Sequence, residues 1–115
     1  MENKILQPDD YLESRLQLLE SYFVKYGAVP TDINMENRAR FGQRATYQRD
    51  GIFFRADTMA GRSGTLLVIE YSDDIEFAKV GSMDDASAFP ADFPDERIEK
   101  EVRYAFEIEP YPDDY

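Results

Sequence analysis

Apolar side chains recur at helical spacing near the start of the chain, between residues 12 and 26. The steps between them are four, three, four and three residues, which places all of them on one face of a helix. The members of this stripe are Leu12, Leu16, Leu19, Phe23 and Tyr26. We therefore predict a helix from about Pro8 to Tyr26, with Arg15 among the residues left for solvent. The stripe covers only about two heptads, so one face of a globular core is a better interpretation than a coiled-coil seam.

Both ends of this helix carry capping signals. Asp10 followed by Glu13 resembles a capping box with Asp10 as the N-cap. Gly27 stands where a left-handed residue commonly ends a helix, and Pro30 follows it. Beyond that point, the sequence suggests a short helical turn within residues 31–42.

The middle of the chain has the pattern of a β-hairpin. Asp50-Gly51 is a strong signal for a two-residue type I′ turn. The pairs that this turn predicts are Arg49 with Ile52, Tyr47 with Phe54, Ala45 with Ala56, Arg44 with Asp57 and Thr46 with Arg55. One register thus makes one face largely apolar and puts opposite charges on the other, and a shift by one residue would scramble both faces.

The second half of the chain adds a strand and a helix. Residues 65–71 contain four consecutive apolar residues, which predicts a central strand covered on both faces. Residues 75–80 fit either a short helix or a fourth strand, and residues 82–93 read as a long acidic loop. Pro94 opens a helix whose buried face includes Ile98, Val102 and Ala105.

These elements predict an α+β fold in a single domain, residues 1–115, with an acidic tail that frays from about residue 109. A meander of three or four antiparallel strands would be packed on one face by an N-terminal and a C-terminal helix. The length of 115 residues suits one domain, and a hydrophobic content of 43% is typical of globular chains.

The charge is unevenly distributed along the chain. The net charge is -11, with a mildly basic segment at residues 36–69 and most of the acids in residues 70–115. Such a field repels nucleic acid and anionic membranes and attracts basic partners, so we expect neither nucleic acid nor membrane as a partner. The arginines of the middle segment could form an RNA-binding patch with nearby rings, but pairing with the acidic half is the simpler explanation. The start of the chain lacks a long apolar run, which favours a cytoplasmic location.

The chain contains no His and no Cys, which excludes imidazole and thiolate catalysis and the metal sites that use these ligands. No P-loop or dinucleotide fingerprint is present. Residues 61–64 could hold an anion through backbone amides, although an ordinary hairpin connection explains them as well. Glu70 and the acids that follow it could offer oxygens to Mg²⁺ or Ca²⁺, but they match no EF-hand loop. We therefore expect no cofactor, no metal and no enzymatic activity.

Three hypotheses for the function remain. The first is a non-enzymatic acidic module that binds a basic protein partner, and in size and charge alone the chain resembles bacterial immunity proteins and antitoxins. The second is an oligomeric or scaffold domain, in which the chain could form a homo-oligomer. The third is a carboxylate- or metal-dependent enzyme. The residues that the first hypothesis assigns to partner binding are Asp73, Asp74, Glu76, Asp84, Asp85 and Asp92.

Overall fold

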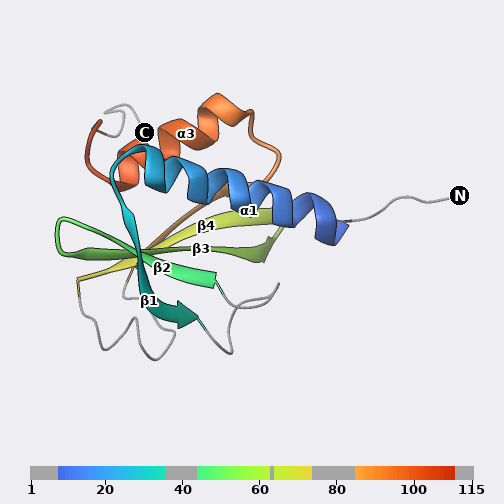
Figure 1. The fold of residues 1–115 in the computed structure, drawn as a ribbon. Helices are drawn as coiled ribbons and strands as arrows, with labels where there is room; N and C mark the ends of the chain where they lie inside the picture. Colours follow the sequence, from blue (N-terminus) through green and yellow to red (C-terminus); the bar gives the residue numbers. More distant parts are fainter. Residues whose placement is uncertain (1–7, 36–43, 63, 74–84, 111–115) are drawn as a thin grey trace, which may run out of the picture.

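The computed structural model describes residues 8–35, 44–62, 64–73 and 85–110 (Figure 1). Its elements follow each other along the chain as α1 (Pro8–Lys25), β1 (Val29–Met35), β2 (Arg44–Arg49), β3 (Ile52–Gly61), β4 (Gly64–Ser72), β5 (Asp85–Pro90) and α3 (Asp95–Ala105). The five strands form one antiparallel sheet in the order β1-β2-β3-β4-β5, so each strand pairs with its neighbour in the chain. Both helices lie on the same face of this sheet (Figure 1). The predicted α+β meander is confirmed, with five strands in place of three or four.

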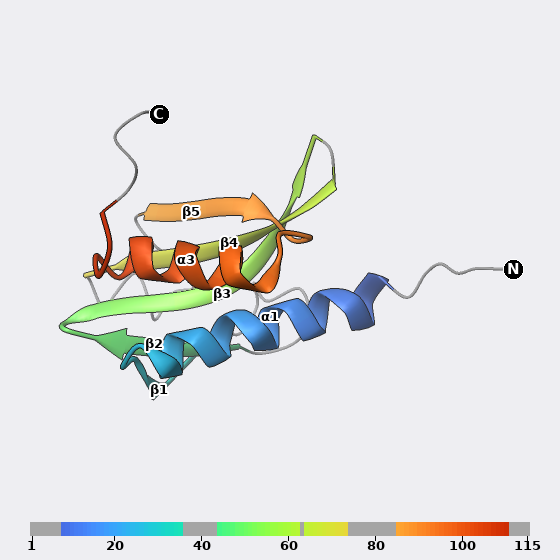
Figure 2. The same cartoon turned by 90° about the horizontal axis from the view of Figure 1, so that it is seen from above.

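The two helices run in the same direction across the sheet (Figure 2). One end of the molecule therefore holds the starts of α1 and α3, the β3–β4 turn and the end of β5. We call it the helix-start end. The opposite end, which we call the helix-finish end, holds the β2–β3 turn and the last residues of β4 and of both helices.

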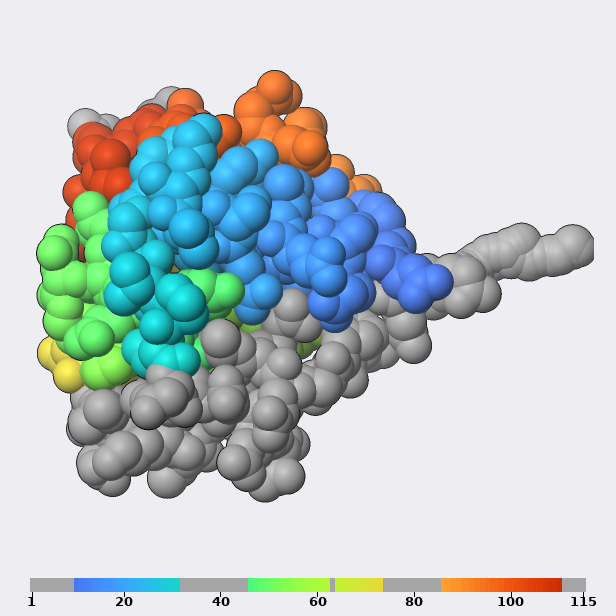
Figure 3. Space-filling model, viewed as in Figure 1, coloured from blue at the N-terminus to red at the C-terminus, as the bar shows by residue number. Residues whose placement is uncertain are grey.

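The first helix lies where its apolar stripe predicts. Leu12, Leu16, Leu19 and Phe23 are buried beneath it, while its outer side forms a continuous surface in the space-filling view (Figure 3). Gly27 has a positive φ of 100°, as expected for a residue that ends a helix. The helix starts at Pro8, so the prediction that Asp10 is its N-cap is wrong, because Asp10 already lies within the first turn.

The β2–β3 hairpin confirms the predicted turn and the register of the residues next to it. Asp50 and Gly51 have φ values of 52° and 81°, both positive as a type I′ turn requires. The ladder pairs Arg49 with Ile52 and Tyr47 with Phe54. Phe54 belongs to the core under the helices, where its ring lies 4.4 Å from that of Phe106 after α3.

Two strands lie in segments that the sequence predicted as a helical turn and as a loop. Val29–Met35 is strand β1, not a helical turn, and Asp85–Pro90 is strand β5, not part of a loop. Both form the edges of the sheet, where the missing N–H of Pro30 and of Pro90 is tolerated. β5 is made mostly of small residues and is anchored by Phe89, which is buried opposite Leu67. The segment 75–80, predicted as helix or strand, lies outside the described residues.

The face of the sheet that points away from the helices contains a buried ion pair. Arg55 is completely buried, although the sequence placed it opposite Thr46 on a polar face. Its Nε and Nη2 donate hydrogen bonds to Oε1 of Glu70 on the neighbouring strand, at 3.2 and 3.0 Å. Among the described residues, its Nη1 has no hydrogen-bond partner.

The last helix buries the predicted residues Ile98 and Val102 completely. Within the helix, Glu99 and Arg103 form an ion pair at 3.8 Å. Beyond the helix, Arg103 Nε donates a hydrogen bond of 2.9 Å to Glu109, where the predicted frayed tail begins. Residues 111–115 of that tail lie outside the described residues.

Candidate functional site

The predicted partner-binding residues that the structure describes lie at two different ends of the sheet. Asp73 follows β4, and Asp85 opens β5 directly beside Tyr71 of β4, which puts both at the helix-finish end. Asp92 follows the other end of β5 and lies at the helix-start end. The length of that strand, about 20 Å at roughly 3.3 Å per residue, separates Asp92 from Asp85. Outside the described residues lie Asp74, Glu76 and Asp84.

The idea of a metal site finds no support in the part of the chain that the structure describes. Within that part, no three acidic side chains come close enough to hold an ion. Glu70, one of the suggested ligands, forms a salt bridge of 3.0 Å with Arg55. Its charge is thus matched by a buried cation.

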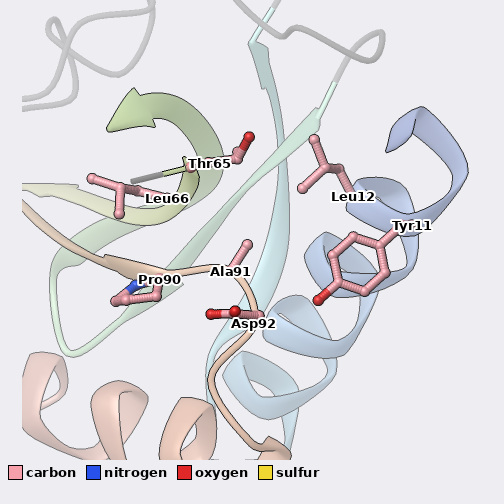
Figure 4. Close-up of a pocket in the computed structure, with 8 residues that line it drawn as sticks. Tyr11, Leu12, Thr65, Leu66, Pro90, Ala91 and Asp92 are labelled. Atoms are coloured by element: carbon pink, nitrogen blue, oxygen red, sulfur yellow. The ribbon is translucent and has the colours of Figure 1, made fainter. Parts of the chain in front are cut away.

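A pocket of about 240 Å³ opens at the helix-start end (Figure 4). Side chains from three distant segments line it. These are Tyr11 and Leu12 of α1, Thr65 and Leu66 of β4, and Ala91 and Asp92 after β5. Leu12 and Ala91 are buried, whereas Tyr11 is 46% exposed and Asp92 is also exposed. The pocket thus has an apolar interior and a carboxylate at its rim.

Arg15 fixes the segment that carries Asp92. Its Nε donates a hydrogen bond of 2.9 Å to the carbonyl of Ala91, and its Nη2 donates another to the carbonyl of Phe93. Its Nη1 pairs with Asp95 at 3.0 Å. The Arg15 side chain is only 15% exposed, so the prediction that it faces solvent is wrong. The turn that connects β5 with α3 is therefore held against α1 by one guanidinium.

The groups that line this pocket can bind a ligand. Its polar side-chain groups are the hydroxyls of Tyr11 and Thr65 and the carboxylate of Asp92. These groups provide no second carboxylate to work with Asp92 as an acid–base pair. The apolar walls suit a hydrocarbon chain, and Asp92 suits a positive charge at the end of that chain.

The helix-finish end has a larger hollow of about 400 Å³. Arg49 lines it, and its Nε and Nη1 donate hydrogen bonds to the carbonyls of Tyr26 and Phe106, at 3.0 and 3.1 Å. The Arg49 guanidinium also lies 3.5 Å from the Asp50 carboxylate. The cation in this hollow is thus used to hold the ends of the two helices to the hairpin.

A network of charged groups joins α1 to α3 near the helix-finish end. Glu99 accepts hydrogen bonds from Lys25 and from the Tyr26 hydroxyl, and these bonds hold the pKa of Glu99 below its usual value. The hydrogen bond from Arg103 likewise lowers the pKa of Glu109. Each of these groups already has an opposite charge beside it, so we regard the network as a clamp between helices.

Sequence reasoning missed Tyr11, Thr65 and Leu66 as site residues. Nothing in their spacing shows that α1, the start of β4 and the end of β5 meet, because this follows from the strand register and from Arg15. The one available signal is that Tyr11 lies outside the apolar stripe of α1 and is still aromatic. Asp92 was included in the prediction, and the structure places it at the rim of the pocket.

No family model, curated protein or solved structure matches this chain. Among the described helices, none is both long and apolar enough to cross a membrane. The class that the coordinates define is a small α+β domain, with a five-stranded antiparallel meander covered on one face by two helices.

Proposed function

We propose that this chain is a non-enzymatic module that binds a basic protein partner through exposed carboxylates. The observation that supports the proposal is that the described cations form salt bridges within the molecule. Every lysine and arginine whose side chain the structure describes, apart from Arg62, forms a salt bridge with a carboxylate of the same molecule. Exposed carboxylates such as Asp92 and Glu96 have no such partner among the described residues.

The chain has eleven more acids than bases, and carboxylates such as Asp92 and Glu96 present part of this excess to a second molecule. Carboxylates on an exposed rim act mainly by steering a basic partner during its approach, which raises the association rate. Asp92 and Asp73 are two such carboxylates at opposite ends of the sheet. They form a matched pair that can locate the binding surface.

The test uses the full chain to capture partners from a lysate of its native host, and then measures binding to each purified candidate. We expect a partner with a basic isoelectric point, and an association rate that falls as NaCl rises from about 50 to about 300 mM. Asp92→Asn should slow association about two- to threefold at low salt, with little effect at high salt. Asp73→Asn is the control with the same chemistry at the other end.

A partner without excess positive charge would contradict the proposal. So would an association rate that neither salt nor either variant changes. If Asp73→Asn slows association and Asp92→Asn does not, the module binds through the helix-finish end.

A further inference from the structure

We infer that the pocket at the helix-start end receives a lysine side chain presented by the basic partner. This inference rests on the proposed function and adds the chemical group that the pocket recognises. It is drawn from the size of the pocket, from its walls and from the charges around its opening.

The pocket is smaller than most sites that bind small molecules or cofactors. Its volume of about 240 Å³ is below the roughly 300–1,000 Å³ of small-molecule and cofactor sites. A space of this size suits a single side chain that projects from a protein surface. Leu12, Leu66 and Ala91 provide aliphatic walls for the four methylene groups of a lysine, which bury well while the charged end stays at the rim.

The oxygens around the pocket suit an ammonium group. They belong to the hydroxyls of Tyr11 and Thr65 and to the carboxylate of Asp92, and the Thr65 hydroxyl lies across the pocket from the other two (Figure 4). An ammonium group has three rotatable donors and can turn toward acceptors that do not share a plane. The planar fork of an arginine instead fits two oxygens of one carboxylate side by side. We therefore favour lysine over arginine.

The surrounding charge also favours a cation. Asp10, Asp92 and Glu96 are exposed at the helix-start end, and none of them has an ion-pair partner among the described residues. Arg15 is nearby, but its guanidinium is bound to two carbonyls and to Asp95. Arg62, in the β3–β4 turn, is the described cation at this end that remains unpaired. Its removal should therefore strengthen binding of a cation.

The experiment is an NMR titration of the ¹⁵N-labelled full chain with a pentapeptide that has one lysine between glycines. Matched peptides carry norleucine or arginine in place of the lysine. We expect saturable shifts at the amides of Leu12, Leu66 and Asp92 with the lysine peptide, and weaker binding of the other two. Asp92→Asn should lower the affinity for the lysine peptide about two- to fivefold, as expected for an exposed ion pair. Arg62→Gln should tighten it, and Asp73→Asn should leave it unchanged.

Several outcomes would overturn the inference. These are equal binding of the norleucine peptide, equal or tighter binding of the arginine peptide, and shifts that spread over the acidic surface without saturating. Shifts that depend on protein concentration without peptide would mean that a second copy of the chain occupies the pocket. If the lysine peptide does not bind while Asp92→Asn still slows association with the basic partner, the proposed function stands and only the assignment of lysine is wrong.

Discussion

The buried pair of Arg55 and Glu70 allows a sharp test of how the sheet is held together. Arg55 is 0% exposed, and two of its nitrogens share one carboxylate oxygen of Glu70, while Nη1 has no hydrogen-bond partner in the part of the chain that the structure describes. Glu70→Ala would leave a buried guanidinium without this carboxylate. Removing one partner of a buried pair costs about 3–5 kcal/mol, because the remaining charge has neither water nor a counter-ion.

That loss is large beside the total stability of a domain of this size, which is about 5–15 kcal/mol. With a urea dependence of about 2 kcal/mol per M, it would lower the unfolding midpoint by about 2 M. The double variant Arg55→Met/Glu70→Gln removes the charge and the unsatisfied N–H together. We expect it to recover most of the loss, because a buried pair replaced by uncharged groups of similar volume is often close to neutral.

Urea unfolding followed by circular dichroism measures these differences. Glu96→Ala is the control, since it removes an exposed carboxylate and should change stability by less than about 0.5 kcal/mol. The reasoning is refuted if Glu70→Ala costs less than about 1 kcal/mol. It is also refuted if the double variant is as unstable as Glu70→Ala alone.

Other substitutions test the core, the hairpin turn and the pH dependence. Leu19→Ala, at a fully buried position, should cost about 2–5 kcal/mol in urea unfolding, whereas Val24→Ala on the exposed side of α1 should cost less than about 0.5 kcal/mol. Gly51→Ala meets no atom within 4 Å, so its expected cost of about 1 kcal/mol comes from the positive φ alone, and an unchanged midpoint would contradict this. Burial raises the pKa of Glu101, so its ionised form lowers the stability of the folded state. Glu101→Gln should therefore raise the Tm at neutral pH, and this gain should disappear at acidic pH, where both the folded and the unfolded state bind the proton. Hydrogen bonds lower the pKa of Glu99 in the folded state. Its contribution to stability is therefore complete above its unfolded pKa of about 4.3, and it disappears as the pH falls through its folded pKa. Glu99→Gln should flatten this part of the Tm-against-pH curve.

The elements that could be predicted from sequence are those specified by local chemistry. The apolar stripe of α1 predicts a helix from its spacing alone, and Asp50-Gly51 predicts a tight turn from its residue types alone. The structure contains both. β5 contains no such local signal, because alanine and serine have weak strand preference and the strand forms through pairing with β4. β1 was predicted as a helical turn for a related reason, since its pairing with β2 cannot be seen in the sequence and its register shifts between Pro30 and Asn34.

The candidate site was less predictable than the fold. Its acidic component, Asp92, could be found because exposed acids are visible in the charge pattern. Its apolar component depends on which strand ends meet, and this is decided by the β4–β5 register and by the hydrogen bonds of Arg15. The same arginine shows that an apparently solvated residue on a helix can position a distant turn.

The sequential order of the strands has a consequence for synthesis on the ribosome. Each strand pairs with the one made just before it, so hairpins can form as soon as their residues emerge. Of the two helices that cover them, α1 precedes the strands in the chain and α3 follows them. We therefore expect the nascent chain to keep one apolar face of its growing sheet partly uncovered until α3 has emerged, and to need shielding from aggregation during that interval.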